Sequence, residues 1–171
     1  MASPPGWPGR WQASSAGDPS SAYASIVDAA AQDIANLIYT YAELIDAGDF
    51  AGVGALLEQA TVTFEGHDLV LTGAEAIEAL YVASTRRYED GTPRTKHVMT
   101  NVIVEVDGTR ASSRSYFTVL QAVPGSVALQ PVVAGRYRDR FEFRGSAWVF
   151  TGMHVIIDLM GDVSGHLLID V

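Results

Sequence analysis

The sequence contains no cysteine, which excludes disulfide bonds, thiolate nucleophiles and zinc sites built on thiolates. Basic residues are also few: 11 lysines and arginines stand against 20 aspartates and glutamates, for a formal charge of −9. Because nucleic-acid binding relies on a basic face, we expect no nucleic-acid partner. No apolar run approaches the roughly 20 residues that span a bilayer, and the N-terminus lacks a basic-then-apolar signal pattern. We therefore expect no membrane partner and a cytoplasmic location.

The composition favours one compact domain. Hydrophobic residues make up 48% of the 171 residues and charged residues only 18%, as in a folded globule. Residues 1–22 are rich in proline, glycine and serine and predict a flexible arm, although Trp7 and Trp11 could dock on the body or on a neighbouring subunit. We expect residues 23–160 to form the domain and residues 161–171 to form a C-terminal tail.

Hydrophobic periodicity predicts helices first and strands later. The pattern indicates helices over residues 25–47, 50–58 and 74–88, and strands over residues 61–65, 69–71, 95–106, 110–122, 133–143 and 147–157. Asp49 follows Gly48 and is expected to cap the second helix. Three helices followed by an antiparallel meander predict an α+β fold in which a curved sheet wraps around the helices.

The strand predicted from Thr95 carries the most distinctive polar residues. Because strand side chains alternate, His97, Met99, Asn101 and Ile103 should share one face. Both faces of this strand are largely apolar, so we expect both to be covered. A titratable histidine and an amide would then point together into apolar surroundings.

Several short motifs, in this order, carry a family resemblance. They are Tyr41-x4-Asp46, Gly48-Asp49-Phe50, Gly73-Ala74-Glu75-Ala76-Ile77, His97-x3-Asn101, Val106-Asp107-Gly108, Ser115-Tyr116-Phe117, Gly135-Arg136-Tyr137-Arg138-Asp139 and Trp148. Together they resemble the SnoaL-like, polyketide-cyclase-like branch of the nuclear transport factor 2 superfamily, which includes scytalone dehydratase and bile acid 7α-dehydratase. The resemblance implies a cone-shaped α+β fold, with a mixed or antiparallel sheet around about three helices, an apolar pocket, and assembly as a homodimer or homotrimer.

The resemblance also implies a site. Dehydratase members of the family use a tyrosine, an aspartate and a histidine at the positions of Tyr41, Asp46 and His97. Relatives often carry a basic residue where this sequence has Met153, and His154 or Arg136 are possible substitutes. As substrate-binding residues we expect Asn101, Tyr81, Tyr116, Tyr137 and Trp148.

Each candidate residue also has a structural interpretation. His97 is either a general acid or base or a core histidine, and Asp46 is either paired with His97 or exposed at the helix end. Arg136, Arg138 and Arg140 either pair with the acidic surface or include one arginine that Asp139 fixes, and we expect the latter. His67 and His166 are expected in solvent, and no histidine pair has metal-ligand spacing, so we expect no metal and no cofactor.

Two functions remain open on this evidence. The first is a cofactor-independent dehydratase or isomerase acting on a small hydrophobic carbonyl compound of steroid, terpenoid or polyketide type. His97 would move a proton, Asp46 would orient His97, and Tyr41 with Asn101 would hold the oxygen. The second is a binding or assembly module that uses the same fold without catalysis.

Overall fold

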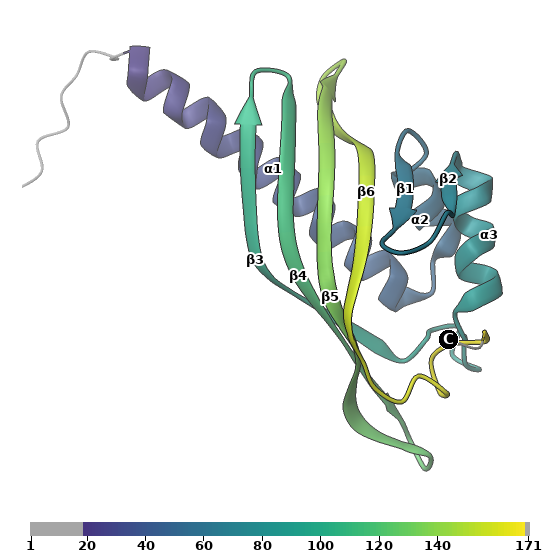
Figure 1. Ribbon diagram of the computed structural model, residues 1–171. Coiled ribbons are helices and arrows are strands. Elements are labelled where there is room, and N and C mark those ends of the chain that lie inside the picture. The colour runs from purple at the N-terminus through teal and green to yellow at the C-terminus, as the bar shows by residue number, and fades with distance from the viewer. Residues whose placement is uncertain (1–18, 170–171) are drawn as a thin grey trace, which may run out of the picture.

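The computed structural model describes residues 19–169 (Figure 1). Trp7, Trp11 and the rest of the predicted arm up to residue 18 lie outside the described residues. The helices are α1 (Pro19–Ala47), α2 (Phe50–Leu56) and α3 (Ala74–Ser84). The strands are β1 (Thr61–Phe64), β2 (Val70–Thr72), β3 (Thr95–Asp107), β4 (Arg110–Val123), β5 (Val127–Arg144) and β6 (Ala147–Met160).

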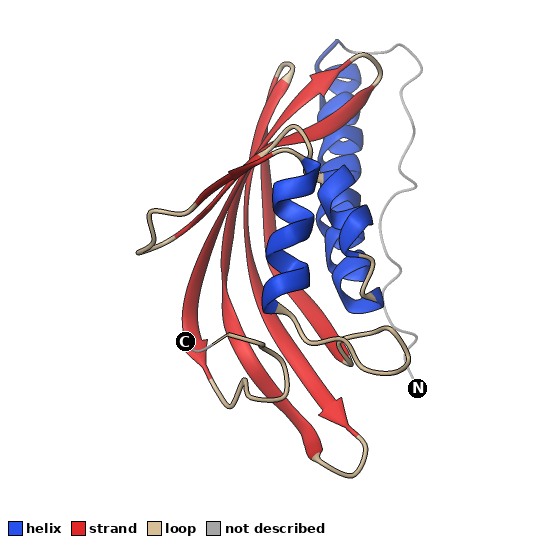
Figure 2. Cartoon of the chain, turned by 90° about the vertical axis from the view of Figure 1, so that its right-hand side faces the viewer, coloured by secondary structure: helices blue, strands red, loops and turns tan. Residues whose placement is uncertain are grey.

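The six strands form one open sheet in the order β2-β1-β6-β5-β4-β3. β1 runs parallel to β6, and every other neighbouring pair is antiparallel, so the sheet is mixed. The helices lie against one face, and the long strands bend along them (Figure 2). This arrangement confirms the α+β class and the wrapped sheet expected from the sequence.

The first helix lies against the sheet because its apolar residues fall on one side. Ile34, Ile38, Tyr41 and Ile45 recur every three or four residues, and each is at most 3% exposed. The helix ends at Gly48, which has a positive φ of 73° and packs so closely on the Gly91 carbonyl that a Cβ would clash with it. These contacts place the C-terminal turn of α1 beside the start of β3.

A bulge in β3 overturns part of the expected side-chain pattern. Asn101 has a φ of 51°, and the pairing register with β4 shifts between Thr100 and Ile103. Beyond the bulge Ile103 is exposed, so the prediction that Asn101 and Ile103 share the face of His97 is wrong. The other face is also uncovered in the single chain, where Val98 is 41% exposed and Ile103 is 44% exposed.

Residues 161–169 pack against the end of α3. The backbone N–H of Leu168 donates to the Ser84 carbonyl at 2.8 Å, and the N–H of Arg86 donates to the His166 carbonyl at 2.8 Å. As a result His166 is only 7% exposed, and its predicted place in solvent is wrong, whereas His67 is exposed as predicted. This segment therefore forms part of the folded body.

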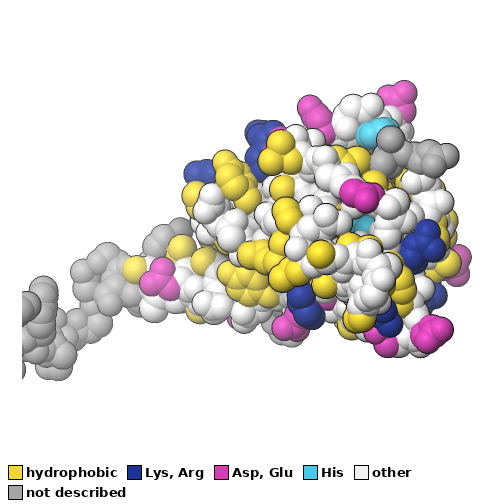
Figure 3. Space-filling model, turned by 90° about the horizontal axis from the view of Figure 1, so that it is seen from below, with side chains coloured by type: hydrophobic (Ala, Val, Ile, Leu, Met, Phe, Trp, Pro, Cys, Tyr) yellow, Lys and Arg dark blue, Asp and Glu magenta, His cyan; other side chains and the backbone are white. Residues whose placement is uncertain are grey.

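Hydrophobic side chains also reach the surface at this end of the molecule. Figure 3 shows them in patches between scattered charged groups, and the exposed ones include Leu159, Met160, Leu168 and Ile169. Within residues 19–169, no helix combines the length and the apolar character needed to cross a membrane.

Candidate functional site

Asp46 and His97 form a buried pair at the contact between α1 and β3. The His97 ring Nδ1 lies 2.8 Å from Asp46 Oδ1, and the backbone N–H of His97 donates to Oδ2 at 2.8 Å. Thr95 Oγ1 donates a third hydrogen bond to Oδ1, also at 2.8 Å. The two side chains are only 6% and 7% exposed. Of the two alternatives for Asp46 that the sequence left open, the structure therefore contains the pair with His97.

These contacts determine the protonation of the pair. Burial acts to raise the pKa of Asp46, but the hydrogen bonds from His97 and Thr95 and the charge of His97 hold this pKa below its ordinary value. Asp46 is then a carboxylate that only accepts hydrogen bonds, so His97 Nδ1 must carry the proton. In neutral His97 the other ring nitrogen, Nε2, is consequently the free proton acceptor.

The pair lines an open hollow of about 580 Å³ between α1 and the start of β3. Other parts of its wall come from Tyr39, Thr92 and Met99. The hollow therefore borders the pair, although little of the two side chains is exposed to it.

Three tyrosines meet in the core between α1, α3 and β5. The hydroxyls of Tyr41 and Tyr81 lie 2.8 Å apart, and the Tyr41 ring packs edge-on against Tyr137 with 5.7 Å between centroids. Burial, together with the neighbouring tyrosines, raises the pKa of all three hydroxyls. They therefore stay protonated hydrogen-bond donors at neutral pH.

The structure brings Tyr41, Tyr81 and Tyr137 together, but it records no hydrogen bond from Tyr41 to Asp46 or His97. The two groups lie within electrostatic range, because the charge of Asp46 contributes to the raised pKa of Tyr137. The candidate site thus consists of a carboxylate–imidazole pair at the surface hollow and a tyrosine cluster deeper in the core.

His166 is a member of this environment that sequence reasoning missed. Burial lowers the pKa of His166 to about 4, and the nearby charge of His97 acts in the same direction. Its Nδ1 is buried and has no hydrogen-bond partner among residues 19–169. No local motif marks this residue, because the contact depends on the C-terminal segment folding back over α3.

The lowered pKa of His166 predicts a pH-dependent loss of stability. Between pH 6.5 and about 4 the unfolded chain binds a proton at this histidine that the folded chain excludes, so the free energy of unfolding falls as pH falls. In His166→Gln we expect this loss to be smaller than in the wild type by about 2 kcal/mol, measured by urea unfolding across that range. An identical pH dependence in both proteins would contradict the assignment.

Asp139 is a second buried carboxyl group, on the sheet face that the helices cover. It is 2% exposed and accepts a hydrogen bond from Ser113 Oγ at 3.1 Å, while its Oδ1 has no partner in the part of the chain that the structure describes. Burial raises the pKa of Asp139 to about 7. No ion pair joins it to an arginine within the described residues, so the prediction that Asp139 fixes an arginine is wrong.

The remaining predicted site residues lie elsewhere. Tyr116 is 51% exposed on the outer sheet face, and Asn101 is exposed at the bulge. Trp148 packs against Phe143 at the beginning of β6. The residue pairs that lead from His97 on β3 across β4 and β5 arrive at the opposite end of β6. These three residues are therefore separated from the Asp46–His97 pair.

The suggested substitutes for a basic residue at Met153 also point away from the core. Met153 itself is 2% exposed and pairs with Asp139 in the register of β5 and β6. Arg136 binds Asp158 and His154 binds Glu65, both on the outer face. In residues 19–169 no cluster of three or more histidine, aspartate and glutamate side chains is placed to hold a metal ion.

A comparison with protein-family models identifies a family, and solved structures share the fold. Residues 29–154 match the family model described as a SnoaL-like domain. The chain is similar to an NTF2-like protein with a cystatin-like fold from Novosphingobium aromaticivorans, with a TM-score of 0.67 and 20% identity over 86% of this chain and 94% of that one. No match is found among curated proteins.

Two further solved structures share the fold. One is a Mycobacterium tuberculosis protein described as of unknown function, with a TM-score of 0.64 and 21% identity over 88% of this chain and 81% of that one. The other, from Novosphingobium aromaticivorans, is provisionally named a scytalone dehydratase and has a TM-score of 0.63 and 18% identity over 82% of this chain and 91% of that one. At these identities the likeness extends to the fold alone.

Proposed function

Because the chain belongs to the SnoaL-like domain family, we propose that it is a cofactor-independent dehydratase or isomerase acting on a small hydrophobic carbonyl compound. We propose a substrate of steroid, terpenoid or polyketide type because the family resemblance implies one. The observation that carries the proposal is the Asp46–His97 pair, in which His97 contacts Asp46 through Nδ1 and lines an open hollow. The provisional name of the scytalone dehydratase neighbour points to the same class of reaction.

His97 acts in this proposal as the group that moves the proton. Nε2 accepts a proton from the carbon next to the carbonyl group, and the electron pair of the broken C–H bond passes to the carbonyl oxygen as an enolate. Asp46 stabilises the imidazolium that forms and keeps the ring in place. In a dehydration the imidazolium returns the proton to a departing hydroxyl group, and water leaves; in an isomerisation it returns the proton to another carbon.

The tyrosine cluster supplies hydrogen-bond donors for the enolate oxygen. The Tyr41 hydroxyl interacts with both Tyr81 and Tyr137, so the three hydroxyl groups share their protons, and a ligand oxygen would take the place of one of these contacts. The raised pKa of the Tyr41 and Tyr81 hydroxyls keeps these protons in place at the pH where an enolate forms. The substrate would have to extend from the hollow beside His97 to the tyrosine cluster.

A second candidate function is a non-catalytic binding module for a small hydrophobic molecule. It is favoured by the absence of a hydrogen bond between Tyr41 and the pair, and by the apolar Met153 where relatives often carry a basic residue. The uncovered outer face of β3 also makes a homodimer or homotrimer part of the proposal, because exposed Val98 and Ile103 would be buried by another copy.

The test is an NMR titration of the nitrogen-15-labelled histidine rings with a cyclic enone. We expect saturable shifts of the His97 ring nitrogens, and parallel changes in Tyr41→Phe that report a weaker complex because a donor to the ketone oxygen is lost. Tyr116→Phe, on the outer face, is the matched control and should bind like the wild type. A ketone that binds while leaving the His97 ring unchanged would contradict the catalytic proposal and favour the binding module.

A further inference from the structure

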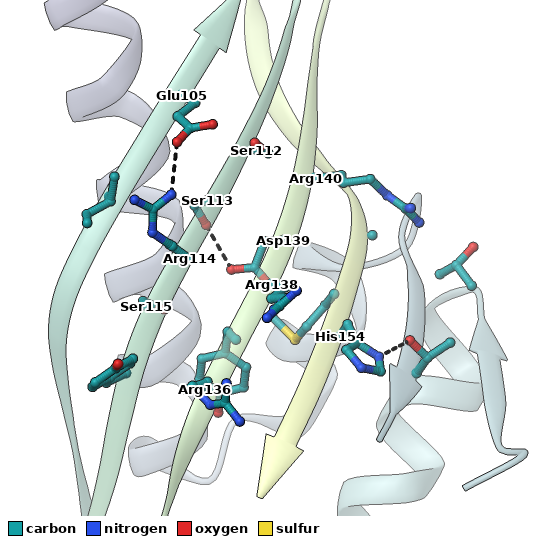
Figure 4. A pocket seen from close by; sticks show the side chains of 17 residues that line it. Glu105, Ser112, Ser113, Arg114, Ser115, Arg136, Arg138, Asp139, Arg140 and His154 are labelled. Carbon is teal, nitrogen blue, oxygen red and sulfur yellow. Dashed lines mark hydrogen bonds and ion pairs between the residues drawn. The ribbon is translucent and has the colours of Figure 1, made fainter. Parts of the chain in front are cut away.

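Three polar side chains are neighbours on the sheet face that the helices cover. They are Ser113 and Ser115 on β4 and Asp139 on β5, here called the serine–aspartate group (Figure 4). Ser113 lies opposite Asp139 in the register, and its hydroxyl donates to Asp139 Oδ2 at 3.1 Å. Ser115 is the diagonal neighbour of Asp139, at about 7–8 Å between Cα atoms. None of the three takes part in the proton transfer proposed above.

Two atoms of the serine–aspartate group are buried and have no hydrogen-bond partner among residues 19–169. They are Asp139 Oδ1 and Ser115 Oγ, in side chains of residues that are 2% and 1% exposed. Buried polar atoms nearly always have a partner, and leaving one without a partner costs stability. A hydroxyl group of a ligand suits both atoms, because it can donate to Asp139 Oδ1 and accept from Ser115 Oγ.

Met153 forms the other side of this place. It lies opposite Asp139 in the register of β5 and β6 and is 2% exposed. A basic residue at this position could form an ion pair with Asp139, whereas a thioether offers no charge to it. The unbranched methionine side chain adapts to irregular shapes, so it can make room for a ligand beside the carboxyl group.

The serine–aspartate group lies far along the sheet from His97. Val133 is opposite His97 through the registers of β3, β4 and β5, and Asp139 is six residues further along β5. At about 3.3 Å per residue, the distance along the strand is roughly 20 Å. The tyrosine cluster lies between the two places: burial raises the pKa of Tyr137, and the charges of both Asp139 and Asp46 add to this rise. A ligand that contacts both places must therefore be long.

We propose that Asp139 and Ser115 bind a hydroxyl group at the far end of a substrate whose reacting end lies at His97. The substrate is then an elongated compound of several fused rings, with one oxygen at each end and an apolar body beside the tyrosine cluster. Asp139 and Ser115 determine specificity in this arrangement and take no part in the chemical step. The inference rests on the proposed function, because it takes the carbonyl end to lie beside His97.

Two steroid enones that differ only in the remote hydroxyl group test the inference: testosterone and its analogue without that group. NMR titration of the nitrogen-15-labelled histidine rings in the full chain gives both affinities and shows whether each enone reaches His97. We expect testosterone to bind at least about tenfold more tightly, because a site built to hydrogen-bond a hydroxyl group rejects a ligand that lacks it.

Variants of the serine–aspartate group assign this preference to its residues. Asp139→Leu should abolish the preference for testosterone, whereas Asp139→Asn keeps a hydrogen-bonding side chain and should retain most of it. Ser115→Ala should also reduce the preference, and it tests the same contact if Asp139→Leu does not fold. Ser112→Ala is the matched control, because it removes an exposed hydroxyl group from the outer face of β4 and should leave both affinities unchanged.

The outcomes separate this inference from the function on which it rests. If neither enone shifts the His97 ring, the proposed function is contradicted and the inference falls with it. If both enones shift His97 with equal affinity, the inference alone is overturned and the proposed function stands. The same holds if Asp139→Leu and Ser115→Ala keep the full preference for testosterone.

Discussion

Asp46→Asn is expected to lower the free energy of unfolding by about 2–4 kcal/mol and to lower turnover of any ketone substrate about 100-fold or more. The carboxylate accepts three hydrogen bonds, two of them from His97, and an amide with one acceptor oxygen leaves buried donors without partners. The imidazole also loses the group that holds its proton on Nδ1, which accounts for the loss of turnover. Urea unfolding and initial rates measure the two effects.

The Asp46 substitution also has a defined pH signature. Because the pKa of Asp46 is lowered by folding, its contribution to stability is present above about pH 4 and is lost as pH falls further through the folded-state pKa. The free energy of unfolding of Asp46→Asn should not show this loss at acidic pH. Thr95→Val is the control: it removes one hydrogen bond to the same carboxylate, costs about 1 kcal/mol, and leaves His97 oriented. Equal losses of turnover in both variants would contradict the orienting role of Asp46.

Asp139→Asn is expected to stabilise the protein, by about 2–3 kcal/mol near pH 8. Burial raises the pKa of Asp139 from 3.8 to about 7, so at higher pH the folded chain holds a charge that is poorly solvated and accepts one hydrogen bond. Removing the charge relieves up to about 4 kcal/mol. Incomplete hydrogen bonding of the new amide offsets about 1 kcal/mol of this gain.

The sign of the pH dependence distinguishes this effect from better packing. In the wild type the penalty is complete above about pH 7 and disappears as pH falls toward 3.8, because the folded state takes up the proton first. The advantage of Asp139→Asn should therefore shrink steadily over that range in urea unfolding. Asp158→Asn, at an exposed ion pair with Arg136, should leave stability nearly unchanged over the same range. An advantage for Asp139→Asn that persists at pH 4 would rule out the charge as its cause.

The parts of the fold set by local sequence patterns were predictable. The stripe on α1, the Asp49 cap on the Gly52 N–H and the strand from Thr95 are all confirmed. The family resemblance is confirmed by the match over residues 29–154. The pairing of Asp46 with His97 could also be predicted as one alternative, because burying an unpaired charge beside an apolar stripe is costly.

Features that depend on long-range packing were not predictable. Alternation along β3 assumes an unbroken strand, and a single bulge at Asn101 reversed which residues face the helices. The sequence around Tyr116 and Trp148 does not indicate which face of the sheet or which end of a strand they occupy. Their expected place in the site followed from the resemblance alone. His166 is near the pair only because residues 161–169 pack against α3.

That packing has a consequence for the order in which the molecule assembles. The segment around His166 lies roughly 70 residues downstream of His97, so a chain growing on the ribosome can complete α1, α3 and the pair's own strand long before this contact is available. Until then His166 is not yet placed where it interacts electrostatically with His97. The electrostatic surroundings of His97 are therefore complete only after the long strands have folded. Any delay in the pairing of these strands delays the completion of the site.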